Sequence, residues 1–207
     1  TGMTLADLRD PRKPLLKQLQ QLAPGTFNHS RQVADIAETA TEAIGGDSLL
    51  AYVGGLYHDI GKMNKPEYFI ENQTGYNRHK DLKPSMSLLV IIGHVKDGIE
   101  LGKEYDLPRE LIHFIEAHHG TTLVEYFYHA ALKSAEEIGE PINESQFRYP
   151  GPKPNTKETG ILMICEAVEA AVKSLKNPDI MKIDAMIDKI IKTRIEDGQL
   201  DECPLTM

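Results

Sequence analysis

The fold class and the chemistry of this chain follow from residues 48–62, which read SLLAYVGGLYHDIGK. Apolar side chains recur at helical spacing from Leu49 to Tyr57, and Asp47 or Ser48 can cap the start of a helix. The helix ends in His58-Asp59, which places an imidazole beside a carboxylate. These two groups can bind one divalent metal, and the other carboxylate oxygen can bridge to a second metal. The stretch therefore predicts a helix with metal ligands at its end.

Helical periodicity continues on both sides of this stretch, and no segment shows the alternation of a half-buried strand. Four prolines exclude a regular helix throughout residues 139–155, and a long loop is expected over 63–83. We predict helices over residues 5–22 (ended by Pro24-Gly25), 28–44, 49–57, 84–105, 108–119, 123–138, from Thr156 or Thr159 to about 172, and over 180–196. The fold class is therefore all-α, a compact helical bundle that forms a single domain over residues 1–207.

Composition and charge exclude several classes of protein. The net charge of -8 argues against a broad basic face, so we expect no DNA or RNA duplex as partner. A small anionic substrate remains compatible, because a local basic cluster such as Arg78, Lys80 and Lys83 is enough to bind it. Two cysteines, 165 and 203, form neither a disulfide framework nor a zinc signature, which fits a reducing compartment. No apolar run reaches the roughly 18 residues that span a bilayer.

Several further histidines and acidic residues lie in apolar helical contexts. A His-Asp pair alone is weak support for a metal site, but buried polar groups need bonding partners, and a whole set of them needs more than scattered hydrogen bonds. The set consists of His29, His58, Asp59, His94, His118, His119 and Glu166. Its composition predicts a site for divalent cations.

The sequence around these residues resembles the HD-domain superfamily of metal-dependent phosphohydrolases. Within it, the chain is similar to the cytoplasmic HD domain of bacterial seven-transmembrane HD hydrolases, from about Leu15 to Leu205. The resemblance is carried by residues 24–30 (PGTFNHS), 56–63 (LYHDIGKM), 66–73 (PEYFIENQ), 94–98 (HVKDG), 118–122 (HHGTT) and 147–154 (FRYPGPKP).

This resemblance implies a helical domain that holds two divalent metal ions, usually iron or manganese, and opens cyclic di-AMP to linear pApA. It implies that one metal takes His29, His58, Asp59 and Glu166. The other would take His94, His118 and His119, with Asp59 as the bridge. The chain begins at Thr1 rather than Met, and we interpret it as a cytoplasmic fragment of a larger protein, anchored upstream in the bacterial inner membrane. A homodimer is an alternative to a monomer.

One ligand departs from the family pattern. That pattern usually has Asp where this chain has Glu166, which keeps the carboxylate but adds a methylene. Glu166 could still reach the metal, bind it less well, or leave that position partly empty.

Asp59 and Lys62 are the predicted catalytic residues, and Lys62 is the first candidate to hold a phosphate oxygen. Weaker substrate candidates are Lys96, Arg148 and Lys153, and Tyr149 could either stack on a base or pack in the core. His79, His113 and His129 do not match the ligand pattern. We interpret His113 and His129 as exposed or structural, and His79, in the polar loop, as solvated in preference to a contact with substrate. Glu169 is interpreted as a solvated residue or as a partner of a ligand.

Two other functions remain open at this stage. One is an HD phosphohydrolase that acts on cyclic di-GMP, (p)ppGpp or (deoxy)nucleotides, although the Gly-Tyr-Pro signature usual in the cyclic di-GMP branch is absent. The other is a degenerate HD domain that binds a nucleotide as a sensor without turnover, and only the Glu166 departure favours it.

Overall fold

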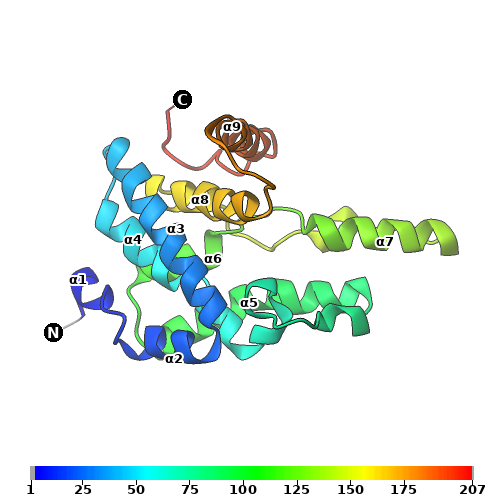
Figure 1. Ribbon diagram of the computed structural model, residues 1–207, viewed down its shortest axis with the longest axis horizontal. Helices are drawn as coiled ribbons and strands as arrows, with labels where there is room; N and C mark the ends of the chain where they lie inside the picture. The colour runs from blue at the N-terminus through cyan, green and yellow to red at the C-terminus, as the bar shows by residue number, and fades with distance from the viewer. Residues whose placement is uncertain (1–2, 207) are drawn as a thin grey trace.

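Helices make up most of the computed structural model, which describes residues 3–206 (Figure 1). Within these residues the sole extended pairing is an isolated antiparallel bridge between Leu123 and Arg148. The all-α prediction is therefore confirmed. The α-helices are α1 (Leu5–Leu8), α2 (Pro14–Leu22), α3 (Pro24–Ala43), α4 (Ser48–Tyr57), α5 (Pro84–Glu104), α6 (Arg109–Ala117), α7 (Glu125–Ile138), α8 (Lys157–Lys173) and α9 (Ile180–Glu196).

The prediction was wrong at the first two helices. The helix predicted over 5–22 is divided into α1 and α2, because Pro11 disfavours helical geometry in the residue before it. Pro24 was predicted to end a helix, but it stands in the first turn of α3, four residues before the predicted start. A proline fits that position because its missing N–H would have no helical partner there.

The other helix starts follow their capping residues. The Asp47 side chain accepts a hydrogen bond from the Leu50 amide at 3.0 Å and caps α4. Thr156 and Thr159 form a reciprocal capping box at the start of α8, so the first of the two predicted starts is correct. The predicted loop over 63–83 contains short 3₁₀ turns: η1 (Ile60–Asn64), η2 (Pro66–Tyr68), η3 (Ile70–Asn72) and η4 (Arg78–Asp81), and η5 (Glu144–Phe147) lies in the proline-rich segment.

Two glycines allow the close packing that positions the later site. A Cβ on Gly55 would lie 2.7 Å from the Cα of Ala34, so α4 packs almost backbone to backbone against α3. A Cβ on Gly61 would lie 1.8 Å from the carbonyl oxygen of His94, so η1 packs equally closely on α5. These contacts bring the end of α4 between α3 and α5.

The core lies where α3 and α4 cross α6 and α8, and two helices lie outside it (Figure 1). No residue of α7 or α9 is fully buried; α7 projects beside α5, and α9 covers α8. Among the described residues, no helix combines the length and apolarity needed to cross a bilayer.

Candidate metal centre

Asp59 lies at the middle of the centre, fully buried just after the end of α4. Its Oδ1 atom is 3.2 Å from Nε2 of His118 and 3.4 Å from Nε2 of His94. Its Oδ2 atom is 3.3 Å from Nε2 of His58 and 3.7 Å from Nε2 of His29. Each oxygen of one carboxylate therefore faces a different pair of imidazoles.

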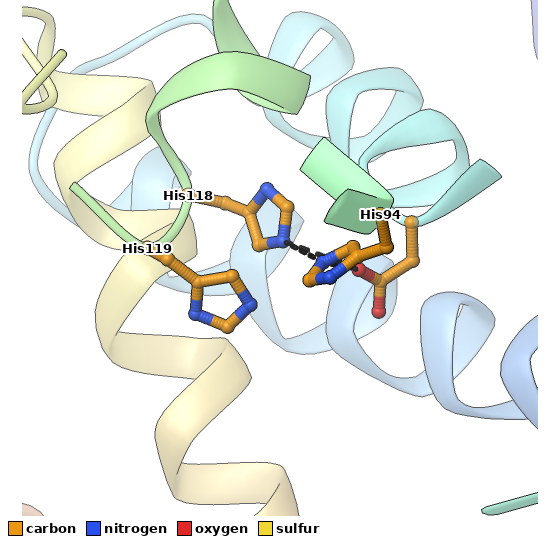
Figure 2. A group of neighbouring side chains, drawn as sticks. His94, His118 and His119 are labelled. Atoms are coloured by element: carbon orange, nitrogen blue, oxygen red, sulfur yellow. Dashed lines mark hydrogen bonds and ion pairs between the residues drawn. The ribbon is translucent and has the colours of Figure 1, made fainter. Parts of the chain in front are cut away.

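The seven residues predicted as ligands come together in two groups that share Asp59. Within each group, one nitrogen or oxygen atom per residue lies within 4.8 Å of those of the others. Figure 2 shows that the side chain of His94, on α5, points toward those of His118 and His119, which follow α6. The two groups are Asp59, His94, His118 and His119, and His29, His58, Asp59 and Glu166.

Backbone carbonyls hold three of the imidazoles with Nε2 toward Asp59. The Nδ1 atom of His58 lies 2.6 Å from the Gly55 carbonyl oxygen. The Nδ1 atom of His94 lies 2.5 Å from the Ile91 carbonyl oxygen, and that of His118 lies 2.8 Å from the Ile115 carbonyl oxygen. A carbonyl oxygen can only accept, so Nδ1 must carry the proton in each ring. The neutral form then presents the lone pair of Nε2 to the centre, as a metal ligand must.

The arrangement has buried polar atoms that lack partners. Within the described part of the chain, no hydrogen bond of good geometry reaches Nε2 of His58 or either oxygen of Asp59. Leaving such atoms unsatisfied is costly, and divalent cations would satisfy them. The residues present therefore fit a pair of cations held by nitrogen and oxygen donors.

Burial and neighbouring groups keep Asp59, Glu166, His94 and His119 in forms that can bind a cation. Burial would raise the pKa of Asp59, but the adjacent His58 ring and the Lys62 ammonium hold that pKa well below its usual range. Burial also opposes ionisation of Glu166, and contact with His29 nevertheless lowers the pKa of this carboxyl. Burial lowers the pKa of His94 and of His119, which keeps both rings neutral. Asp59 and Glu166 are therefore ionised at neutral pH, whereas the rings of His94 and His119 are neutral.

His29 differs because carboxylates surround it. Its Nε2 lies 3.6 Å from Glu166, and its Nδ1 contacts the buried carboxylate of Glu169. Burial alone would lower the pKa of His29, but the contact with Glu166 and the charge of Asp59 raise it to about 9. The Lys173 ammonium lies 2.5 Å from Oε1 of Glu169. The Glu169 carboxylate therefore lies between the Lys173 ammonium and the His29 ring. Of the two interpretations of Glu169, the structure matches the partner of a ligand.

Lys62 lies beside the carboxylate of Asp59. Its Nζ atom is 3.2 Å from Oδ2 of Asp59 and 2.7 Å from Oε1 of Glu71. Burial alone would lower the pKa of Lys62, but these two carboxylates raise it, so the ammonium stays charged. Lys62 also lines a cleft of about 670 Å³ together with Asn28, His29, Gln32, Ile70, Glu166 and other residues. The cleft gives a solute direct access to one side of the centre.

The remaining predicted substrate residues are arranged differently. Tyr149 lies at the centre, stacked on His119. Lys96 is exposed on α5. Arg148 is directed elsewhere, because its guanidinium binds the carboxylates of Glu144 and Asp197 and the carbonyl of Thr121. Lys153 lies near Gly198, where a Cβ would be 3.5 Å from its Nζ atom. Lys62 and Tyr149 are therefore the two that the fold brings to the centre.

Sequence reasoning missed Glu71 as a partner of Lys62, although Glu71 lies in the quoted stretch 66–73, because that loop has no periodicity that indicates where its side chains point. For Glu169 the sequence left two interpretations open, and its position three residues after Glu166 on the same helix face was the signal for the partner of a ligand. His79 fastens the loop instead of facing solvent: its nitrogens lie 2.8 Å from Oγ of Ser87 and 2.6 Å from the carbonyl of Tyr68. His113 is half-buried beside Glu116, and His129 is exposed, as interpreted from the sequence.

Comparison with known proteins decides the family. A family model described as HD domain matches residues 26–171. The chain belongs to the HD domain family. Over 95% of this HD domain, it superimposes on 91% of a solved chain described as the phosphodiesterase PgpH HD domain of L. monocytogenes, with a TM-score of 0.89 and 47% identity. A second solved structure of that domain, in complex with cyclic di-AMP, gives the same TM-score and identity.

Curated relatives of this HD domain are longer proteins. It is 45% identical over 205 residues to "Cyclic-di-AMP phosphodiesterase PgpH" of Bacillus subtilis, covering 99% of this chain and 28% of the relative. It is 47% identical over 208 residues to the protein of the same name from Listeria monocytogenes, covering 100% of this chain and again 28% of the relative. The chain thus spans less than a third of the length of these relatives.

Proposed function

We propose that this HD domain is the hydrolytic part of a cyclic-dinucleotide phosphodiesterase that converts cyclic di-AMP to linear pApA. The observation that carries the proposal is the buried Asp59, whose two oxygens face separate groups of imidazoles. Its support is the similarity along nearly the whole chain to proteins named for this activity and to a domain solved with cyclic di-AMP.

Two divalent cations, iron or manganese, are the proposed cofactors. His29, His58, Asp59 and Glu166 would hold one ion, and Asp59, His94, His118 and His119 the other. When bound, such a pair supplies an activated water and neutralises charge on the phosphate. Mixed imidazole and carboxylate ligands suit these metals. The chain contributes an ionised bridge at Asp59 and neutral rings with Nε2 directed inward.

Lys62 is the residue proposed to hold a phosphate oxygen. Its ammonium is charged, lies 3.2 Å from the bridging carboxylate and lines the cleft. Glu71 holds that ammonium in place, so little side-chain freedom remains to be lost when a phosphate binds. The cleft volume of about 670 Å³ lies within the range of small-molecule sites, roughly 300–1,000 Å³. The cleft is therefore large enough for a cyclic dinucleotide, with Lys62 as the cation that would meet a phosphate.

We also propose that the longer parent protein is membrane-anchored, with this domain on the cytoplasmic side of the inner membrane. The support is the resemblance to the cytoplasmic domain of membrane-bound hydrolases and the much greater length of the relatives. A homodimer stays a prediction, as does the extent of the domain over residues 1–207.

A nucleotide sensor without turnover is the second candidate, favoured by Glu166 in place of the usual Asp. Bound metal and turnover separate it from the enzyme. The chain is to be loaded with Mn²⁺ or Fe²⁺, assayed for metal content, and incubated with cyclic di-AMP, cyclic di-GMP and ppGpp. We expect two ions per chain and pApA as the product. Binding of cyclic di-AMP without product would establish the sensor, and fewer than two ions in the loaded chain would remove the two-metal assignment.

Variants of two proposed metal ligands, His58 and Asp59, sharpen this test. We expect His58→Ala and Asp59→Ala to abolish hydrolysis and lower bound metal while the helical circular-dichroism signal persists, because each removes a ligand from a preformed cradle. His129→Ala is the matched control, since His129 is exposed outside the centre. Hydrolysis that survives in either ligand variant contradicts the proposal.

A further inference from the structure

His119 is held differently from the other histidines of the centre. The rings of His29, His58, His94 and His118 each have a carboxylate or carbonyl at Nδ1. Among the described residues, neither ring nitrogen of His119 has a hydrogen-bond partner of this kind. A ligand imidazole usually depends on such a partner for its orientation. The orientation of His119 must therefore come from packing.

The packing partner is the ring of Tyr149. The two ring centroids lie 4.2 Å apart and the planes differ by 9°, so the rings are stacked face to face. His118 packs on His119 at 4.1 Å with a tilt of 47°, and His94 meets it edge-on at 5.3 Å. Parallel stacking restricts rotation of an imidazole out of its plane, and the neighbouring rings restrict its translation.

Tyr149 is itself fixed to the turn that carries His119. The Tyr149 amide donates to the Thr122 carbonyl at 3.0 Å, and the Val124 amide donates to the Phe147 carbonyl at 2.8 Å. Thr122 in turn donates to the His119 carbonyl through its hydroxyl at 2.7 Å and its amide at 3.0 Å. The tyrosine ring and the imidazole are thus held in register by a short chain of backbone contacts.

We propose that Tyr149 is a positioning residue that orients His119 for the second cation through its flat ring. The inference rests on the proposed metal centre and deepens it. It assigns the ring of Tyr149 to the histidine rather than to a substrate base, because His119 occupies one face of that ring and Tyr149 is buried. Loss of the ring leaves His119 free to rotate, so the ion held by His94, His118 and His119 should bind more weakly.

The experiment compares Tyr149→Leu, which removes the flat ring, with Tyr149→Phe, which keeps it. Mn²⁺ is titrated into the metal-free 207-residue chain, and bound ion is followed by calorimetry and electron paramagnetic resonance. We expect Tyr149→Leu to weaken one of the two binding steps on the order of 10-fold, the usual effect of losing a partner of a ligand, and to leave the other step unchanged. Tyr149→Phe should bind both ions like the wild type.

A matched control is Tyr128→Leu, since Tyr128 is a partly buried tyrosine that packs on Phe147, with 5.6 Å between ring centroids, and stacks on no histidine of the centre. It should bind both ions normally. If Tyr149→Leu does not fold by circular dichroism, Tyr149→Met and Tyr149→Trp make the same comparison between a flexible side chain and a flat one.

Three results overturn the inference: unchanged affinity in Tyr149→Leu, equal weakening in Tyr149→Phe, or equal weakening of both binding steps. If the wild-type chain itself binds fewer than two ions, the proposed centre fails instead, so the two failures are distinguishable.

Discussion

Replacing Gly61 by alanine tests whether the close packing of η1 on α5 sets the metal centre. The added Cβ would lie 1.8 Å from the His94 carbonyl oxygen and 2.5 Å from the Gly98 nitrogen. Real Cβ contacts are essentially never shorter than 3.0 Å, so η1 and α5 must separate by at least about 1.2 Å. His94 and Asp59 lie on opposite sides of this contact, with 3.4 Å between Nε2 and Oδ1. The separation therefore widens the second group of ligands directly.

The magnitude follows from that displacement. Overpacking of this kind costs about 1–3 kcal/mol in the free energy of unfolding. In a chain of this length, each 1 kcal/mol lowers Tm by about 2–4 °C. A misplacement of about 1 Å in a catalytic group lowers turnover on the order of 100-fold. We therefore expect Gly61→Ala to fold with a Tm several degrees lower, to lose the second ion and to hydrolyse cyclic di-AMP about 100-fold more slowly.

Gly93→Ala is the matched control, because Gly93 precedes His94 on α5 and an added Cβ there meets nothing within 4 Å. Its metal content should match the wild type, and its Tm should be equal or slightly higher, since alanine favours a helix over glycine. Melting by calorimetry, metal analysis and product chromatography make the comparison. Wild-type Tm and metal content in Gly61→Ala would refute the packing argument, and metal loss in both variants would show that α5 tolerates no substitution there.

Three further predictions concern α3 and α8. Glu166→Asp, which restores the residue usual in the family, should keep or raise metal content by elemental analysis; a clear loss would show that residue 166 has another role. Glu169→Leu should weaken the ion held by His29 by about 10–100-fold in a Mn²⁺ titration, because His29 loses its partner at Nδ1, whereas Glu169→Gln keeps an acceptor and should lose less. In the metal-free chain the pKa of His29 is raised from 6.5 to about 9, so its protonation stabilises the fold fully below pH 6.5, and that stability is lost as pH rises through 9. Melts of the chelator-treated chain from pH 6 to 9.5 should show this loss, and a His29→Gln variant with the same pH slope would exclude His29 as the cause.

Local chemistry made many helix limits predictable from the sequence. Asp47, Thr156 and Asp179 cap helices through their own side chains, so α4, α8 and α9 begin where the sequence indicates. Pro24 was misinterpreted because a proline can either end a helix or begin one. The difference depends on Asn72 and Glu71, whose oxygens bind the Thr26 amide and hydroxyl at 3.0 Å each and fix the start of α3. No local pattern contains that information.

The candidate site likewise has features that could be predicted from the sequence and features that depend on distant partners. The seven proposed ligands could be named from their motifs, because the family resemblance adds spatial information that spacing alone lacks. The ion pairs of Arg148 and the pairing of Lys62 with Glu71 could not, since they depend on partners in other segments. Arg148 is held by Asp197, 49 positions away, and Lys62 by Glu71 in an irregular loop. A basic side chain near a motif therefore indicates an anion site only after its acidic neighbours are known.

Under the proposed assignment, the one carboxylate of Asp59 would serve both cations, so the loading of one ion would depend on the other. Asp59 offers each ion one oxygen of the same charged group, and neutralising that charge at the first ion would lower its attraction for the second. Cooperativity in metal uptake would then be an intrinsic property of this aspartate. A substitution at that position would change the affinity of both sites together.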